Sequence, residues 1–359
     1  MPAHPGLHLT RTEENVEEID ALARLLGGRV GLETMLGDLD RQGRRGLAPG
    51  LKVHRSFTFD AADRRDERWW PQGISTSADA SEAETIGGRR IVAVAWYAKK
   101  LPGDASGNHG SRITFFDLDT RRYRHVLLVV PKIEDGRLVL APLRAHAGGI
   151  VWSGPYLHVA ATAKGFHTCR LDDLLRIPDD LAGPTSGIGI EDDRVSSHGY
   201  RYVLPVRFSY SAAAAEGEER LRYSFMSLDR DTTPPSLVVG EYARGKQTRR
   251  LVRFALDPET HLLSTADDNL ARPFLLGDGV RRMQGAVMAR GRLHVTTSEG
   301  PWGLGSLYAG APGELRQHRW ATPMGPEDIT YWPSTDLLWS VSEHPRRRWI
   351  YAVRRASVT

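Results

Sequence analysis

Residues 90–97 read RIVAVAWY, a short run of alternating and continuous apolar residues that follows a turn at Gly87 and Gly88. Short runs of this kind, bounded by Gly, Pro, Asp and Asn, are typical of β-strands. Similar runs occur at 156–162 (YLHVAAT), 236–242 (SLVVGEY), 292–298 (RLHVTTS) and 336–342 (DLLWSVS). A strand that recurs in this way indicates that the chain repeats one supersecondary unit.

Further strand-like runs surround each of these segments in the same order. A short polar segment, usually with glycine, precedes each one, at 71–74 (PQGI), 146–150 (HAGGI), 223–226 (YSFM), 283–286 (MQGA) and 326–329 (PEDI). A third run follows each one, at 112–118, 165–171, 250–256, 305–309 and 349–353. Fourth runs are expected at 123–130, 200–208, 262–274 and 315–320. The repeated unit therefore has four strands.

The fifth unit lacks a fourth strand, because the chain ends at Thr359. Residues 51–59, before the first unit, can supply that strand and leave no free sheet edge. Closure of this kind is typical of β-propellers. The sequence thus predicts an all-β, five-bladed β-propeller over residues 51–359. A six-bladed alternative would convert one of two insertions, 178–197 or 212–219, into a weak blade.

Residues 1–50 differ in texture and predict a short helical N-terminal extension. Residues 10–13 (TRTE) match a capping box, and apolar residues then recur at helical spacing. Those residues are Val16, Ile19, Leu22 and Leu26, followed by Gly27 and Gly28, which stop a helix. A second amphipathic piece spans 30–39. The extension is expected to cap a propeller face or to mediate dimerisation.

Four segments carry a resemblance to a known group of proteins: 71–74 (PQGI), 146–152 (HAGGIVW), 233–242 (TPPSLVVGEY) and 326–329 (PEDI). They resemble a group of uncharacterised bacterial β-propeller proteins of the five-bladed type, many of which look secreted. The resemblance covers residue 51 to the C-terminus and implies the fold. It transfers no activity.

Composition and charge exclude several classes of function. The single cysteine, Cys169, allows no intrachain disulfide, and residues 1–11 lack the basic and apolar pattern of a signal peptide. The longest apolar run, 91–98, is too short to span a membrane. We therefore expect a cytoplasmic protein with no membrane partner. The net charge is +4, and its paired arginines fall at strand ends and turns, so no nucleic-acid partner is expected.

Two motifs come close to known catalytic patterns and fail. Residues 240–246 (GEYARGK) approach a phosphate-binding loop, but Gln247 replaces the required Ser or Thr and a strand follows instead of a helix. We interpret the segment as a β-turn. Residues 183–187 (GPTSG) place serine one position away from a nucleophile elbow.

The opening residues of the first strands are the best candidates for a site, because the first strand of each blade lines the central channel. The predicted set is Gln72, His146, Tyr223, Gln284 and Glu327, with Asp328 beside Glu327. Converging polar groups at the mouth of a concave site indicate a small-molecule ligand. Polar residues with trapped water could also fill a channel without any function.

Two chemistries fit this set. In one, Glu327 and Asp328 bind a divalent cation that acts as a Lewis acid. In the other, His146, Glu327 and Tyr223 are catalytic without a metal, and Gln72, Gln284, His198 and Arg282 bind the substrate. The two insertions would roof the site. We expect a small-molecule enzyme of the cyclase, lyase or hydrolase type; the alternative is a non-catalytic propeller that binds a ligand or a protein partner.

Overall fold

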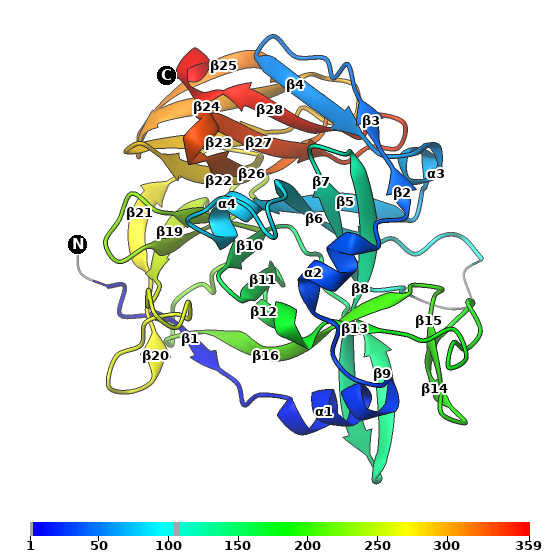
Figure 1. The fold of residues 1–359 in the computed structure, drawn as a ribbon. Coiled ribbons are helices and arrows are strands. Elements are labelled where there is room, and N and C mark those ends of the chain that lie inside the picture. The colour runs from blue at the N-terminus through cyan, green and yellow to red at the C-terminus, as the bar shows by residue number, and fades with distance from the viewer. Residues whose placement is uncertain (1–2, 104–107) are drawn as a thin grey trace.

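The computed structural model describes residues 3–103 and 108–359 and shows a β-propeller (Figure 1). Within these residues, five antiparallel four-stranded units follow one another, and we number them as blades 1 to 5. Blade 1 holds β5 (Trp69–Thr76), β6 (Ile91–Ala98), β7 (Ser111–Asp117) and β8 (Arg122–Glu134). Blade 2 holds β10 (Ile150–Ser153), β11 (Tyr156–Ala160), β12 (Gly165–Arg170) and β16 (Tyr202–Ala214).

The remaining blades have the same order from the channel outward. Blade 3 holds β17 (Phe225–Asp229), β18 (Ser236–Gly240), β19 (Arg250–Ala255) and β21 (Phe274–Asp278). Blade 4 holds β22 (Met283–Ala289), β23 (Arg292–Thr297), β24 (Gly305–Ala311) and β25 (Glu314–Thr322). Blade 5 holds β26 (Pro326–Trp332), β27 (Leu337–Ser342), β28 (Ile350–Arg354) and β4 (Val53–Thr58). The first strands contact one another in a closed ring, β5–β10–β17–β22–β26–β5.

Blade 5 closes the ring as the sequence predicts. β4 pairs antiparallel with β28, so that Phe57 lies opposite Ile350 and Ser56 lies opposite Tyr351. The two strands lie side by side at the top of Figure 1, although one is near the start of the chain and the other near its end. α3 (Ala61–Arg65) then carries the chain from β4 into β5. β4 thus supplies the fourth strand of blade 5.

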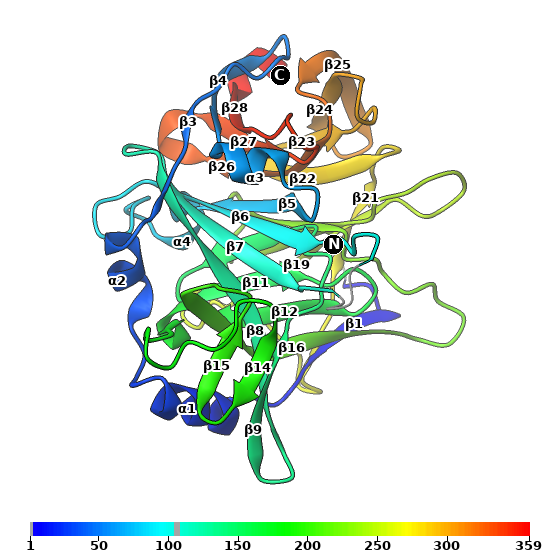
Figure 2. The same ribbon diagram turned by 90° about the vertical axis from the view of Figure 1, so that its right-hand side faces the viewer.

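Three segments depart from the sequence-based expectations. The outer strand of blade 3 begins at Phe274, because residues 262–273 form a loop that contains β20 (Leu270–Ala271). The insertion at 178–197 forms the hairpin β14 (Ile188–Glu191) and β15 (Arg194–Ser197) instead of a sixth blade. Figure 2 shows this hairpin beside β9 (Arg137–Pro142), which it contacts. The insertion at 212–219 extends from β16, whose end pairs with β1 (Leu7–Arg11).

The N-terminal extension wraps the outer strands of blades 1 and 2. It contains the unpredicted strand β1 and then α1 (Val16–Leu25) and α2 (Gly31–Gly37). Asn15, not Thr10, precedes α1, so the expected capping box is wrong: residues 10 and 11 belong to β1. Leu22 and Met35 are buried in the cores beneath the two helices. The extension is therefore packed against the sides of the blades and not across a mouth of the channel.

The smaller elements complete the connections between these strands. They are β2 (Arg41–Gln42), β3 (Arg44–Arg45), α4 (Ser77–Ala80), β13 (Leu175–Arg176) and three 3-10 turns at Leu171–Asp173, Pro333–Thr335 and Arg355–Val358. β16 and β8 also pair in parallel, which joins blades 1 and 2 into one sheet. Among the described residues, no helix has both the length and the apolar composition needed to cross a membrane.

The apolar core lies between neighbouring blades, where the second strands contribute their large side chains. The residues expected there, Trp96, Val159, Val239, Val295 and Trp339, are all buried. Trp339 packs against Trp332 and Phe57, with ring centroids 6.4 and 6.2 Å away. These contacts hold the closing strand to blade 5 and leave the polar ends of the first strands free to form the channel mouth.

Candidate functional site

The openings of the first strands crowd together at one mouth of the channel. A Cβ added to Gly73 would meet Gly149 and the backbone nitrogen of Ile150, and one added to Gly285 would meet Asp328 and Ile329. Glycine at these positions lets neighbouring backbones approach. Gly149 makes the same close approach to Phe225 and Met226 in blade 3. The residues one step earlier therefore occupy equivalent positions: Gln72, Gly148, Ser224, Gln284 and Glu327.

This register differs from the predicted one in blades 2 and 3. His146 lies two positions before the equivalent Gly148, and Tyr223 lies one position before Ser224. Tyr223 is buried in the apolar core beside Phe166 and Phe254, so its hydroxyl does not reach the mouth. His146 is exposed, and its ring lies 4.4 Å from that of Tyr97 at the end of β6. The sequence pattern of a polar residue, a glycine and an apolar residue does not fix the equivalent positions in these blades, because blade 2 has two glycines and blade 3 has none.

Two glutamates form the centre of the site. Glu327 opens β26 and is 3% exposed, and Glu343 directly follows β27. Because β26 and β27 are antiparallel, the start of one lies beside the end of the other, and the two carboxyl groups hydrogen-bond to each other. Glu343 also accepts a hydrogen bond of 2.9 Å from Nε2 of Gln72.

The electrostatics of this pair favour the protonated form of Glu327. Burial raises the pKa of Glu327 well above its usual range, and the charges of Glu343 and Asp328 add to the shift. Burial also raises the pKa of Glu343, but the charge of Lys99 and the hydrogen bond from Gln72 oppose that rise. Two adjacent carboxyl groups do not ionise independently, because the first negative charge disfavours the second. Both pKa shifts therefore favour one proton shared between Glu327 and Glu343.

Lys99 is one source of positive charge beside the pair. It follows β6, and its Nζ lies 3.0 Å from the centre of the Trp70 ring. Burial lowers the pKa of Lys99, and the charge of Glu343 opposes that shift. Tyr97, two positions earlier, faces the same pair: burial and the charges of Glu343 and Glu327 raise its pKa.

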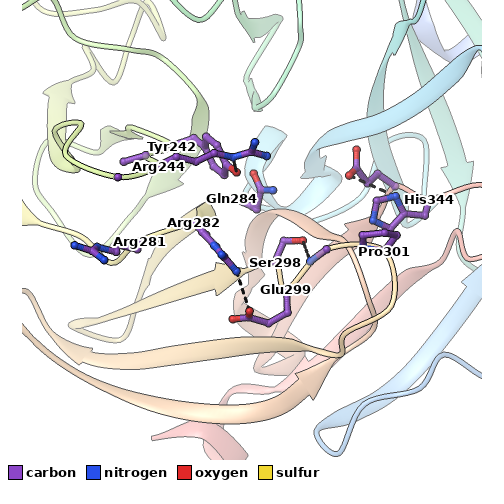
Figure 3. A pocket seen from close by; sticks show the side chains of 13 residues that line it. Tyr242, Arg244, Arg281, Arg282, Gln284, Ser298, Glu299, Pro301 and His344 are labelled. Carbon is purple, nitrogen blue, oxygen red and sulfur yellow. Dashed lines mark hydrogen bonds and ion pairs between the residues drawn. The ribbon is translucent and has the colours of Figure 1, made fainter.

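Glu343 opens onto a pocket of about 560 Å³ (Figure 3). Gln284 and Glu343 line it at the channel mouth, and His344 lies beside them. Its other walls come from the loop after β18, from the residues before β22 and from the loop after β23. In Figure 3 the arginines stand on the side of the pocket opposite His344. The pocket thus joins a buried carboxyl pair to a strongly cationic wall.

Gln72, Gln284, Glu327 and Arg282 therefore lie together at or beside one mouth. His198 does not. Its ring stacks on His109 at 4.0 Å, and it lines a different pocket, over blade 1, together with Asp63. The insertions 178–197 and 212–219 contribute no residue to the pocket at the mouth, so they do not roof it.

Asp328 points into the channel. One carboxylate oxygen accepts hydrogen bonds from the backbone N–H groups of Ile74 and Ile150, at 3.3 and 3.4 Å. Glu327 faces Glu343 instead, so the two neighbouring carboxylates have different partners. In the part of the chain that the structure describes, no three His, Cys, Asp or Glu side chains are grouped to hold a metal ion. The residues present do not favour the expected cation site.

The sequence pattern does not predict Glu343, Lys99 and His344 as site residues. A signal for them exists, since each lies within two residues of the end of a second strand, β27 or β6. In an antiparallel pair, the end of the second strand lies beside the opening of the first. Polar residues just after a second strand are therefore as close to the channel mouth as those that open a first strand.

No family model matches the chain, and no curated protein matches it. Solved structures give remote similarities. A gluconolactonase from Xanthomonas campestris is 13% identical, with 98% of this chain and 99% of that chain covered and a TM-score of 0.37. The β-propeller domain of Cps50 (Swd1) from Myceliophteria thermophila is 11% identical, with 84% and 98% covered and a TM-score of 0.39.

A GH43_1 enzyme from Xanthomonas citri, solved with xylotriose, is 10% identical, with 96% of each chain covered and a TM-score of 0.35. These similarities are too distant to transfer an activity. The assignment of the propeller rests on the strand pairing and on the closed ring of first strands.

Proposed function

We propose that the protein is a small-molecule enzyme of the hydrolase, lyase or cyclase type that uses Glu343 for acid–base catalysis at the channel mouth. One observation carries the proposal: Glu343 lines an open pocket and lies beside the buried Glu327, whose pKa is raised well above its usual range. Carboxyl pairs whose environments separate their pKa values are a common way of assigning an acid and a base. Glu343 is the member that a substrate in the pocket can reach.

The proposed step conserves protons. The Glu343 carboxylate accepts a proton from a substrate hydroxyl, a substrate C–H group or a water molecule, and so becomes a neutral carboxylic acid. It then returns that proton to the departing or newly formed group, and the starting state is restored. The raised pKa of Glu343 makes this base stronger than an ordinary carboxylate near neutral pH.

The surrounding residues have separate roles in this proposal. Gln72 and Lys99 favour the ionised form of Glu343, since one donates a hydrogen bond to it and the other attracts its charge. Glu327 keeps its proton and holds the orientation of Glu343. Gln284 and His344 line the pocket beside Glu343 and would orient the substrate.

The test is a comparison of substrate turnover between the wild-type protein and Glu343→Gln. Each protein is incubated with a mixture of small metabolites, and consumption is followed by mass spectrometry. Glu314→Gln is the matched control, because Glu314 is exposed at the start of β25 and does not line the pocket. We expect Glu343→Gln to slow turnover by about 100-fold or more, the usual contribution of a general acid or base.

Two results would contradict the proposal. One is unchanged turnover by Glu343→Gln. The other is a wild-type protein that retains a metabolite without converting it, which would identify a non-catalytic binding propeller.

A further inference from the structure

We infer that the rim of this pocket binds an oxyanion group of the ligand, a phosphate or a carboxylate. Anion binding does not depend on catalysis by Glu343. Only the statement that the bound anion is a substrate rests on the proposed function. It gives the class of substrate: a small molecule whose anionic group sits on the rim while its reacting group reaches Glu343.

The charge of the pocket wall carries this inference. Arg244 lies in the loop between β18 and β19, and Arg281 and Arg282 precede β22. Glu299 is the carboxylate on this wall, and its Oε2 lies 3.1 Å from Nη1 of Arg282. Among the described residues, no hydrogen bond or ion pair is found for the side chain of Arg281. Three arginines thus line this wall with a single carboxylate among them.

The backbone fixes the positions of these arginines. The N–H of Arg282 donates to the carbonyl oxygen of Ala243 at 3.3 Å, and the N–H of Ser298 donates to the carbonyl oxygen of Arg282 at 3.4 Å. Arg282 therefore ties together the three segments that form the wall. Its φ of 59° lies in the left-handed region, which non-glycine residues adopt rarely. Within the wall, Arg244 donates from Nε to the Tyr242 hydroxyl at 2.7 Å.

Guanidinium groups suit this role because their planar N–H donors match the geometry of carboxylate and phosphate oxygens. The segment 240–246, which resembles a phosphate-binding loop, forms part of the same wall. It is a hairpin loop with no following helix, and the N–H of Arg244 is already bonded to Oε1 of Gln247. The arginine side chains, and not an amide cradle, would therefore hold the anion.

Arg282 on the rim and Gln284 beside Glu343 are close together in the sequence. Gln284 lies two positions after Arg282 at the start of β22, and both residues line the pocket. The same strand opening thus presents an anion-binding group at the rim and an amide beside Glu343. A ligand that contacts both must be small enough for a pocket of about 560 Å³.

The inference is tested by titrating the protein with inorganic phosphate and, separately, with acetate, and measuring heat at low ionic strength. The test variant is Arg281→Gln with Arg282→Gln, and the control is Arg137→Gln, an exposed arginine on β9 outside the pocket. We expect saturable binding of at least one anion by the wild type. The double variant should bind that anion tenfold more weakly or worse, whereas the control should stay within twofold.

The two anions separate the possible sources of the charge, since a preference for phosphate over acetate indicates a phosphorylated substrate and the reverse indicates a carboxylic acid. Glu343→Gln should bind the anion at least as well as the wild type. If Glu343→Gln binds the anion but turnover is unaffected, the proposed function fails and the anion site stands. The anion site is overturned if neither anion binds the wild type, or if the double variant binds as tightly as Arg137→Gln.

Discussion

The side-chain amide of Gln72 donates a 2.9 Å hydrogen bond to the carboxylate of Glu343, although 271 positions separate the two residues. Gln72 belongs to blade 1 and Glu343 to blade 5, the blades that meet where the ring closes. The closing strand β4 completes blade 5, and α3 connects β4 to β5, the first strand of blade 1. The candidate site therefore depends on closure of the propeller, and it cannot form from either half of the chain alone.

Lys99→Met should move the acid limb of the pH–activity profile to higher pH. The Lys99 charge opposes the rise in the pKa of Glu343, so its loss raises that pKa further. Catalysis requires ionised Glu343, and activity would then be lost at a higher pH by about one unit. Lys100→Met is the control, because the neighbouring lysine is exposed. Equal profiles for the two variants would show that Lys99 does not act on Glu343.

Glu327→Gln should stabilise the protein as the pH rises. The folded-state pKa of Glu327 is raised, so its stabilising contribution is present below the usual carboxyl pKa and is lost as the pH rises toward the folded-state value. Glutamine resembles the protonated form of glutamate and does not ionise, so its contribution to stability does not fall as the pH rises. Relative to the wild type, its free energy of unfolding should gain about 1.4 kcal/mol per pH unit over that range. Denaturant titrations at pH 5 and pH 8 measure the gain, and a pH-independent difference would count against a protonated Glu327.

Asp63→Asn should destabilise the fold by about 3–5 kcal/mol, the cost of breaking a buried ionic network. The Asp63 carboxylate lies 3.0 Å from Nη2 of Arg112, 2.6 Å from the Tyr123 hydroxyl and 2.9 Å from Nε2 of His125. Burial would raise the pKa of Asp63, but its partners outweigh burial and hold the pKa far below the usual range.

The pH dependence of that effect has a definite sign. A depressed carboxylate pKa stabilises the fold above the usual value near 4, and the stabilisation is lost as the pH falls. The wild type should therefore lose its advantage over Asp63→Asn on acidification, as followed by thermal melts between pH 7 and pH 3. Asp40→Asn is the control, since the Asp40 side chain is 50% exposed and pairs with Arg124. A constant difference across this range would argue against the ionic role of Asp63.

Trp339→Ala should lower the free energy of unfolding by about 3–5 kcal/mol, as truncation of buried aromatic residues does. Its side chain is 1% exposed and packs against Phe57 of the closing strand. Trp320→Ala removes a side chain that is 60% exposed and should cost far less. Equal losses in the two variants, measured by denaturant unfolding, would mean that Trp339 does not bind the closing strand to blade 5.

The propeller could be predicted from the sequence because period-two apolar patterns in short runs such as 90–97 and 336–342 are strong and recur in order. Closure by residues 51–59 followed from the missing fourth strand. The strand β1 was missed because residues 7–11 gain a partner only through the long extension of β16, a contact that no local pattern shows. The sequence pattern also predicts one strand over residues 262–274. In the structure, residues 262–273 form a loop whose short strand β20 pairs with β1, a contact between distant segments that the local pattern does not show.

The site was predicted in part. Gln72, Gln284 and Glu327 could be predicted because each opens a first strand, directly before a glycine or an acidic residue. The structure adds a register shift between the first and second strands at each of these positions. His146 and Tyr223 were displaced because blades 2 and 3 carry small residues, Gly148 and Ser224, at the equivalent positions. Glu343 lies 16 positions after Glu327 and becomes its neighbour only through the antiparallel pairing of β26 with β27.

The proposed role of Glu343 depends above all on the protonation state of its neighbour Glu327. Infrared spectra recorded near neutral pH can resolve the carbonyl band of a protonated carboxyl group, and the difference between wild type and Glu327→Gln isolates this one residue from other buried carboxyl groups. Glu299→Gln serves as the exposed control. If Glu327 is protonated, we expect a protonated carboxyl band in the wild type and in Glu299→Gln. This band should be lost in Glu327→Gln. A spectrum in which Glu327→Gln removes only an ionised carboxylate band would contradict this prediction.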